Sequence, residues 1–229
     1  LHMAALMTES GAATEVELVW GTTSSYVCRL RPCVANIEEA SRVACGRYAI
    51  TGGLGGLGLQ AACLFLQQGA STVMLTSRSG RVMRVNQGLD AQLRTLRARV
   101  QVLPCDSADP RDAHESFRTG YSLCGLLHTA GVLQDTRLQA MGFDDMGASL
   151  SPKAFAASHL YWASTSMPLE ASVMFSSIAS LMGNYGQGNY AAANAYLDAA
   201  AIRTRVDGNV ASTLQIPAVS GAGMGSSCF

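Results

Sequence analysis

Charged side chains are scarce in this sequence. Only 14% of its 229 residues are charged, compared with about 25% in an average soluble domain. The 16 basic residues balance the 16 acidic ones, and Lys153 is the single lysine among them. Because the chain has neither a net positive charge nor a run rich in lysine and arginine, it lacks the electrostatic features of a nucleic-acid-binding protein.

Long apolar runs are also missing. No segment reaches the roughly 18 apolar residues of a membrane-spanning helix, and residues 1–7 lack the basic start and apolar stretch of a signal peptide. Cys28 and Cys33 lie close together, but no second pair at zinc-binding spacing accompanies them. We therefore expect a reduced, cytoplasmic protein with no metal ion and no membrane partner.

What the sequence does contain, from residue 47 onward, is a regular alternation of short apolar runs and helical stretches. Buried strands that alternate with helices are typical of a parallel sheet covered on both faces. We therefore expect an α/β fold, a doubly wound Rossmann-type domain. The expected strands are 48–51, 72–76, 100–103, 123–128, 172–175 and 210–216, and the expected helices are 57–68, 91–99, 110–118, 151–164 and 190–204.

Residues 1–45 differ in character from the rest. Two short strands are expected at 16–20 and 26–30, separated by a turn of glycine, threonine and serine. A weakly amphipathic stretch follows at 34–44. We interpret residues 1–45 as an N-terminal segment or linker and residues 46–229 as the main domain.

A glycine-rich turn at residues 51–58 lies between the first expected strand and the first expected helix. Glycines there allow the backbone to approach a pyrophosphate, which the helix N-terminus then stabilises. The alternative is a strand–helix turn that holds no ligand. The predicted cofactor contacts in this turn are Thr51, Gly52, Gly53, Leu54, Gly56 and Leu57.

The residues after the second and third strands indicate which dinucleotide is bound. A domain that prefers NAD usually offers an acidic residue after the second strand for the ribose. Here Arg78, flanked by Ser77 and Ser79, suits a 2′-phosphate, so we predict NADPH; the alternative is a solvated surface arginine. Asp106, beside Ser107, could accept a hydrogen bond from the adenine amino group or cap the following helix.

Four motifs together carry a family resemblance. They are the glycine turn, His128-Thr129-Ala130-Gly131-Val132, Phe175-Ser176-Ser177, and the run Gly186-Gln187-Gly188-Asn189-Tyr190-Ala191-Ala192-Ala193-Asn194. On these motifs, residues 47–224 resemble the short-chain dehydrogenase/reductase superfamily, and within it the ketoreductase domains of modular polyketide and related fatty-acid synthases. The resemblance adds Thr129, Ala130 and Gly131 to the cofactor contacts. It implies that His128 packs beside the cofactor, the alternative being a role in acid–base catalysis.

The resemblance also implies a catalytic tetrad of Lys153, Ser177, Tyr190 and Asn194. Tyr190 would protonate the carbonyl oxygen, Ser177 would hydrogen-bond it, Lys153 would tune Tyr190 and hold the nicotinamide ribose, and Asn194 would position a proton relay. A free phenol has a pKa of about 10, and a nearby ammonium should lower it. Taken one at a time, Tyr190 could be a half-buried tyrosine, Ser177 a helix cap and Asn194 a polar helix residue. Ser176 is the alternative to Ser177 as the serine of the tetrad.

Three positions bear on stereochemistry. Family members that give the B-type product carry Leu-Asp-Asp after the fourth strand, where this chain has Leu133, Gln134 and Asp135. The position of the tryptophan that marks A-type members is Met182, and Asn189 also favours the B-type. Tyr185 does not favour the B-type, because that site is often proline in B-type members. The resemblance therefore predicts a D-configured β-hydroxy product.

The implied reaction is the reduction of a β-ketoacyl thioester on an acyl carrier protein, in polyketide or fatty-acid synthesis, beside neighbouring domains of a larger synthase. Residues 1–45 would be the remnant of a structural subdomain, and the substrate-covering helix and final strand are expected to be absent, so that the domain is C-terminally truncated. Two alternatives remain: a non-catalytic Rossmann module kept for binding or assembly, and a free-standing reductase of another small carbonyl.

Overall fold

The computed structural model describes residues 19–20, 24–26, 44–84, 87–117 and 122–219. The chain divides into two compact units, residues 1–42 and 43–229, which are described separately. In the first unit, β1 (Val19–Trp20) pairs antiparallel with β2 (Ser25–Tyr26). The rest of the expected strands 16–20 and 26–30, and nearly all of the stretch 34–44, lie outside the described residues.

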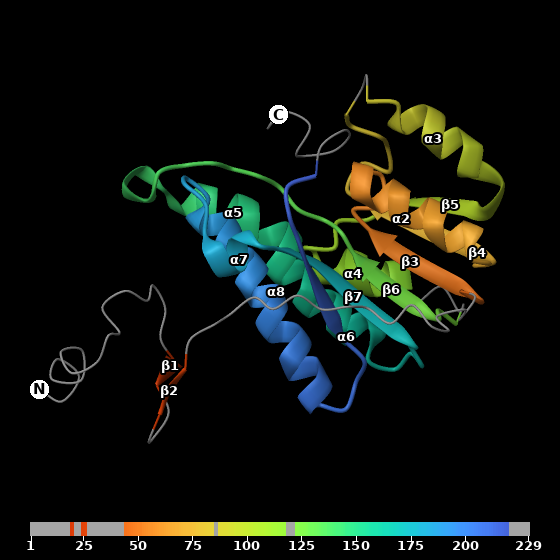
Figure 1. Cartoon of the computed structure of the whole chain (residues 1–229). Coiled ribbons are helices and arrows are strands. Elements are labelled where there is room, and N and C mark those ends of the chain that lie inside the picture. Colours follow the sequence, from red (N-terminus) through yellow and green to blue (C-terminus); the bar gives the residue numbers. More distant parts are fainter. Residues whose placement is uncertain (1–18, 21–23, 27–43, 85–86, 118–121, 220–229) are drawn as a thin grey trace, which may run out of the picture. The chain divides into compact units, whose positions relative to one another are not determined.

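The second unit is built on a six-stranded parallel sheet (Figure 1). The strand order is β5-β4-β3-β6-β7-β8. Successive strands are added on one side of β3 up to β5, and from β6 on the other side; such folds bind dinucleotides at this switch point between β3 and β6. The predicted Rossmann-type fold is therefore confirmed. The strands are β3 (Arg47–Thr51), β4 (Thr72–Ser77), β5 (Val100–Pro104), β6 (Gly125–His128), β7 (Ala171–Ser177) and β8 (Ser212–Ile216).

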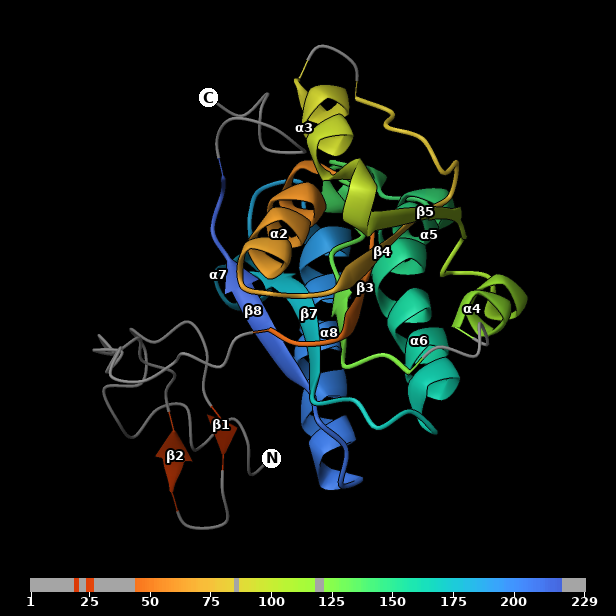
Figure 2. The same cartoon turned by 90° about the vertical axis from the view of Figure 1, so that its right-hand side faces the viewer.

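Helices cover both faces of the sheet, because successive strand residues point to opposite sides. In Figure 2, α2 lies on one side of the sheet and α4 and α6 lie on the other. Ile50, Val73 and Leu75 belong to the core cluster on the α2 side, and Ala49 and Met74 to the cluster on the α4 and α6 side. The helices are α2 (Gly56–Gln67), α3 (Leu89–Leu96), α4 (Pro110–Phe117), α5 (Phe143–Leu150), α6 (Ala156–Ser164), α7 (Ala179–Met182) and α8 (Gly188–Val206).

The helix that carries Lys153 differs from its prediction. Instead of beginning at residue 151, it begins as α5 and passes through a π-helical turn, Ser151–Phe155, into α6. Pro152 accounts for the change of helix type, because it has no N–H to donate and its ring crowds the carbonyl four residues earlier. Within the turn, the N–H of Ala156 donates to the carbonyls of Ser151 and Lys153.

The remaining helices and strands match their predictions to within a few residues. Helix α7 was not predicted, and the end of the expected helix 91–99 is a 3-10 turn, Arg97–Arg99. Helix α2 ends just before Gly69, whose φ of 105° suits glycine.

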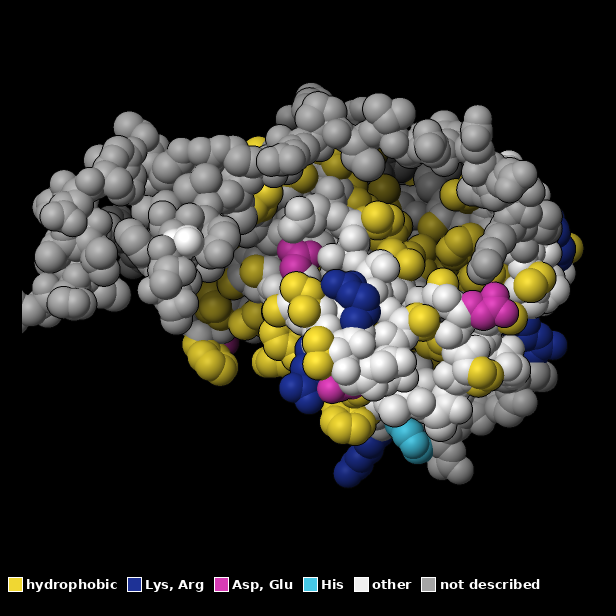
Figure 3. All heavy atoms as spheres, turned by 60° about the horizontal axis from the view of Figure 1, so that its bottom comes forward, with side chains coloured by type: hydrophobic (Ala, Val, Ile, Leu, Met, Phe, Trp, Pro, Cys, Tyr) yellow, Lys and Arg dark blue, Asp and Glu magenta, His cyan; other side chains and the backbone are white. Residues whose placement is uncertain are grey.

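The surface reflects the low charge of the sequence. On the face seen in Figure 3, charged side chains are few and hydrophobic side chains form several patches. Across the described ranges, no helix has the length and apolar character needed to cross a membrane.

Candidate functional site

The carboxyl ends of the parallel strands bring the predicted cofactor residues to one edge of the sheet. Thr51, the last residue of β3, pairs with Thr76 of β4 on one side and with His128 of β6 on the other. The backbone N–H and hydroxyl of Thr129 both donate to the Thr51 carbonyl, at 2.9 and 2.8 Å. Ligands of open α/β sheets bind at this edge.

The glycine turn packs backbone against backbone. Gly52 has a φ of 68°, and a Cβ added there would lie 2.6 Å from the Ala130 backbone. A Cβ on Gly58 would lie 2.7 Å from the Gly52 carbonyl oxygen. The residue before α2, Gly55, offers no side-chain acceptor to the first N–H groups of the helix, which are therefore available to an anion. The turn fits the pyrophosphate of a nicotinamide dinucleotide.

Arg78 and Asp106, predicted to contact the adenosine half of the cofactor, line a common cavity. Its volume is about 610 Å³, and Phe143 at the start of α5 and Pro152 of the π-helical turn also line it. Arg78 is exposed at the carboxyl end of β4. The Arg78 guanidinium is thus accessible at this cavity, and its contact with a 2′-phosphate stays a prediction.

Asp106 does not cap the following helix, so that alternative is wrong. Its Oδ1 accepts from the N–H of Ala108, whereas Asp109 Oδ1 accepts from the N–H groups of Arg111 and Asp112 at the start of α4. The cap is three residues further along than the sequence suggested, because Asp109 directly precedes Pro110, the first residue of α4.

The hydroxyls on either side of Arg78 differ in their surroundings. Ser79 Oγ donates to the Arg81 carbonyl and accepts from the Arg81 N–H, which closes a local turn. Ser77 Oγ is buried and has no partner within the described chain. Ser107 is buried at the carboxyl end of β5.

Lys153 and Tyr190 come together from two different helices. The Lys153 side chain is only 2% exposed, and its Nζ donates to the Phe175 carbonyl at 2.8 Å. The same Nζ lies 5.5 Å from the centre of the Tyr190 ring. The lysine that the resemblance assigned to the preceding helix therefore reaches the tyrosine on α8.

Asn194 and the two serines complete this cluster. Asn194 Nδ2 donates to the Tyr190 carbonyl at 2.8 Å, while Asn194 Oδ1 is buried with no partner in the described structure. Ser176 Oγ donates to the backbone carbonyl of Asn194. Ser177 Oγ accepts from the N–H of Ala179 at the start of α7. The Ser177 side chain also lies near enough to the Tyr190 phenol to lower its pKa. Ser177 is thus both a cap and a neighbour of the phenol.

Burial shifts the pKa values of both Lys153 and Tyr190. Burial raises the pKa of Tyr190, and hydrogen bonding by Asn194 and Ser177 acts in the opposite direction. The sequence-based expectation of a lowered pKa is therefore wrong for this structure. Burial lowers the pKa of Lys153 to about 8, and the negative charge of Asp198 opposes that shift. The raised pKa keeps the phenol protonated, which is the form that a proton donor requires.

Hydrogen bonds join the predicted stereocontrol residues after β6 to the start of α8. Gln187 Nε2 donates to both carboxylate oxygens of Asp135, at 3.2 and 3.1 Å, and Asn189 Nδ2 donates to the carbonyls of Gln134 and Asp145. Asn189 is fully buried, so it shapes the loops rather than facing solvent. Met182, at the end of α7, is 64% exposed.

One polar cluster beside the tetrad escaped the sequence analysis. Asp198 Oδ2 accepts from Ser180 Oγ at 2.7 Å and from Gln215 Nε2 at 2.9 Å, and Ser180 Oγ also donates to the Ser177 carbonyl. Asp198 lies four residues after Asn194, which lies four after Tyr190, so the helical spacing was the signal that could have indicated it.

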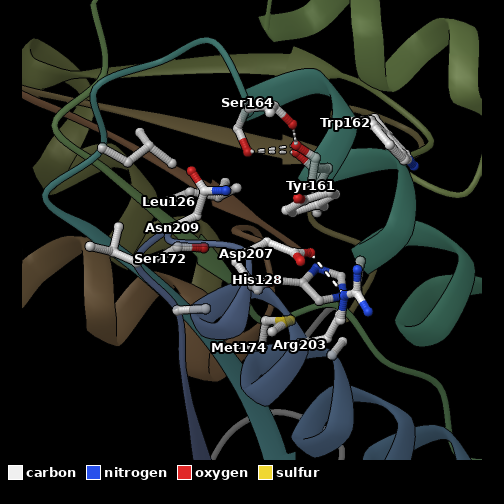
Figure 4. A pocket seen from close by; sticks show the side chains of 18 of the residues that line it. Leu126, His128, Tyr161, Trp162, Ser164, Ser172, Met174, Arg203, Asp207 and Asn209 are labelled. Atoms are coloured by element: carbon white, nitrogen blue, oxygen red, sulfur yellow. Dashed lines mark hydrogen bonds and ion pairs between the residues drawn. The ribbon is translucent and has the colours of Figure 1, made fainter.

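A second cavity of about 680 Å³ lies between α6, α8 and the strands β6 and β7 (Figure 4). Leu126, His128 and Met174 line it from the sheet, and Arg203 pairs with Asp207 at 3.0 Å beside it. None of the four tetrad residues lines this cavity. It is therefore separate from the predicted site.

Similarity to known proteins agrees with this geometry. Residues 46–221 match the family model of the KR domain. The polyketide synthase GfsA of Streptomyces halstedii is 41% identical over 174 residues, which are 74% of this chain and 2% of that protein. The pikromycin polyketide synthase component PikAIII of Streptomyces venezuelae is 35% identical over 221 residues, 94% of this chain and 14% of that protein.

Solved structures of ketoreductases share the fold. A-type ketoreductases from a modular polyketide synthase superpose with a TM-score of 0.82 at 31% identity, covering 97% of this chain and 48% of theirs. The first ketoreductase of the tylosin polyketide synthase gives 0.80 at 32% identity, covering 92% and 46%. The chain thus spans about half of these structures and a small part of the synthases. It belongs to the KR family, the ketoreductase domains of polyketide synthases.

Proposed function

We propose that this chain reduces a β-ketoacyl thioester, carried by an acyl carrier protein, to the β-hydroxyacyl thioester with NADPH. Membership of the KR family makes it an oxidoreductase domain with a nicotinamide-cofactor site. The observation that supports the reaction most directly is the approach of Lys153 Nζ to the Tyr190 ring, with the side chains of Ser177 and Asn194 nearby. A non-catalytic Rossmann module would not need all four side chains gathered in one place.

The proposed chemistry divides between the cofactor and this chain. NADPH, when bound, supplies the hydride to the carbonyl carbon. Tyr190 donates its phenolic proton to the carbonyl oxygen, and Ser177 Oγ hydrogen-bonds that oxygen. Lys153 stabilises the phenolate that the proton transfer leaves behind. Asn194 Oδ1, which is buried without a partner in the described chain, is the free acceptor from which we infer the proton relay.

The glycine turn and Arg78 would hold the cofactor. Close backbone packing at Gly52 and Gly58 keeps the turn tight, and the uncapped N–H groups at the start of α2 would bind the pyrophosphate. Arg78, on the cavity shared with Asp106, would pair with the 2′-phosphate that distinguishes NADPH from NADH. Thr129, Ala130 and Gly131, which follow β6 beside the turn, would contact the nicotinamide half.

The substrate and its carrier are inferred from the family. The relatives are polyketide synthases many times longer than this chain, so we infer an acyl carrier protein and neighbouring synthase domains as partners. We also infer that residues 1–45 belong to a structural subdomain and residues 46–229 to the catalytic one.

We infer B-type stereochemistry from Asp135, Met182 and Asn189. Two solved neighbours are described as A-type and A1-type ketoreductases. That description belongs to those proteins, because the type depends on a few side chains near the substrate and not on the fold they share.

A cofactor titration followed by product analysis tests the proposal. NADPH should quench the intrinsic fluorescence of the chain at lower concentration than NADH does, and a short β-ketoacyl thioester should then be reduced to the D-β-hydroxy product. Binding of neither cofactor would favour the non-catalytic module. NADPH binding with an L product would overturn the stereochemical assignment alone.

A further inference from the structure

Asp198, midway along α8, is a carboxylate that the proposed chemistry does not use. Its Oδ2 accepts from Ser180 Oγ at 2.7 Å and from Gln215 Nε2 at 2.9 Å. Its Oδ1 is buried and has no hydrogen-bond partner in the described chain. Because a buried carboxylate oxygen without a partner is destabilising, this position calls for an explanation other than stability.

The hydrogen bond from Ser180 attaches a very short helix to a long one. Helix α7 has a single turn, Ala179–Met182, and a helix of this length is not stable by itself. Ser180 is the one polar residue in its sequence. Asp198 therefore holds α7 against α8 through the one polar side chain that α7 has.

Helix α7 begins at the turn that carries Ser177. The N–H of Ala179 donates to Ser177 Oγ at 3.1 Å, and Ser180 Oγ donates to the Ser177 carbonyl at 2.8 Å. Because a hydroxyl has one proton, Ser180 shares it between this carbonyl and the Asp198 carboxylate. Ser177 Oγ uses a lone pair to accept from Ala179, so its own proton can be donated to a substrate oxygen. The placement of α7 therefore sets the position of the Ser177 hydroxyl.

Asp198 belongs to the same helix as the proposed acid. Tyr190, Asn194 and Asp198 follow one another at intervals of four residues along one side of α8. We propose that Asp198 is a positioning residue: through Ser180 it holds the Ser177 hydroxyl where that hydroxyl and the phenol meet the same carbonyl oxygen. The proposal rests on the proposed function, in which Ser177 and Tyr190 act on one oxygen.

A direct effect of the carboxylate charge on Lys153 is the competing role. The negative charge of Asp198 raises the pKa of Lys153, against the burial that lowers it to about 8. Assays at about pH 6, well below that value, favour the charged ammonium in the wild type and in the variants. Under these conditions a change in kcat reports position rather than the ionisation of the lysine.

Ser180→Ala removes the connection and leaves the charge of Asp198 in place. We expect kcat to fall about 10-fold, less than the roughly 100-fold that a misplacement of about 1 Å can cost, with the KM for NADPH nearly unchanged. Asp198→Ala should lower kcat similarly, whereas Asp198→Asn retains an oxygen that accepts from Ser180 and should keep most of kcat. A wild-type kcat in Ser180→Ala, or equal losses in Asp198→Asn and Asp198→Ala, would overturn the proposal.

A double-mutant cycle tests whether the effect passes through Ser177. Asp198→Ala should lower kcat about 10-fold in the wild type and hardly at all in Ser177→Ala, because the hydroxyl that it positions is then gone. Asp207→Ala, which removes a carboxylate directly after the same helix, is the matched control and should have no effect in either background. A further loss of the same size in Ser177→Ala would show that Asp198 acts elsewhere and would overturn the proposal.

Failure of the proposed function is distinguishable from failure of this inference. If the wild-type chain reduces no β-ketoacyl thioester, amide hydrogen exchange measured by NMR still decides the inference. The N–H of Ala179 reports on the turn because it donates to Ser177 Oγ, and the N–H of Ile50, in the buried strand β3, reports global unfolding. Ser180→Ala should accelerate exchange at Ala179 relative to Ile50, whereas Asp207→Ala should not. An unchanged ratio in Ser180→Ala would contradict the proposal.

Discussion

The ammonium of Lys153 lies 5.5 Å from the centre of the Tyr190 ring, in a site where the lysine is 2% exposed. The two residues are held there from different elements, Lys153 by a π-helical turn and Tyr190 by the first turn of α8. Burial moves the two pKa values apart, lowering that of Lys153 to about 8 and raising that of Tyr190. Near neutral pH the phenol therefore keeps its proton, and Lys153 remains mostly charged beside it.

Tyr190→Phe removes the proposed acid and leaves the ring in place. We expect kcat to fall by about 10²–10⁴-fold, the usual contribution of a general acid, while the affinity for NADPH stays near that of the wild type. Steady-state NADPH consumption and a fluorescence titration measure the two quantities. Tyr161→Phe, which alters the separate cavity, is the matched control. A wild-type rate in Tyr190→Phe would exclude the mechanism.

Lys153→Arg keeps the charge but changes its shape. The planar guanidinium is larger than the compact ammonium and cannot reproduce its position between the Phe175 carbonyl and the Tyr190 ring. We expect most of the reductase activity to be lost. The reverse exchange at an exposed site, Arg111→Lys, should leave the activity unchanged. Equal activity of Lys153→Arg and the wild type would show that Lys153 does not act through its geometry.

Arg78→Ala tests cofactor selectivity. The loss of a charge-assisted hydrogen bond to the 2′-phosphate should raise the Kd for NADPH by about 10- to 100-fold and leave the Kd for NADH nearly unchanged. Fluorescence titration with both cofactors measures the ratio. Arg94→Ala, on the exposed side of α3, is the control. Equal weakening of both cofactors would mean that Arg78 does not read the 2′-phosphate.

Gly58→Ala should disrupt the glycine turn, because the added Cβ would lie 2.7 Å from the Gly52 carbonyl oxygen and from Gly53 Cα. We expect a lower melting temperature and the loss of stabilisation by NADPH, both measured by thermal unfolding with and without the cofactor. Gly147→Ala in α5 meets open space and should stabilise the fold by up to about 1 kcal/mol. A Gly58→Ala protein that is stabilised by NADPH like the wild type would contradict this account of the turn.

The buried His128 predicts a specific acid sensitivity. Its pKa is about 3 in the folded chain, compared with 6.5 in the unfolded chain. Between these values the unfolded chain binds a proton that the folded chain excludes, so the free energy of unfolding falls as the pH falls through this range, by at most about 1.4 kcal/mol per pH unit.

Urea denaturation of the wild type and His128→Asn between pH 7 and pH 4 measures this effect. The carboxyl groups contribute alike to both proteins, so the difference between their pH dependences isolates the histidine. His128→Asn should lose less stability on acidification. Parallel curves for the two proteins would place the ring in a solvated, titrating environment.

The sheet could be predicted from sequence because its signals are local, whereas the four tetrad positions come from the family resemblance and stay a prediction. Buried parallel strands appear as short apolar runs, and Tyr190 and Asn194 are one helical turn apart. The start of α5 could not be predicted in this way, since Gly147 interrupts the helical pattern. A distant residue also holds this helix, because Asn189 Nδ2 of α8 donates to the carbonyl of Asp145. The pKa of Tyr190 also depends on burial by distant residues, for which the sequence carries no local signal.

The π-helical turn around Pro152 fixes the rotation of α5 about the helix axis relative to α6. Because each residue of an α-helix turns the chain by about 100°, deleting a single residue between Phe143 and Leu150 would rotate the first part of this helix relative to the second by that angle. Either α5 would lose its contact with Asn189 or Lys153 would swing out of the cluster around Tyr190. Length along this one helix is therefore as strict a requirement as the identity of its lysine.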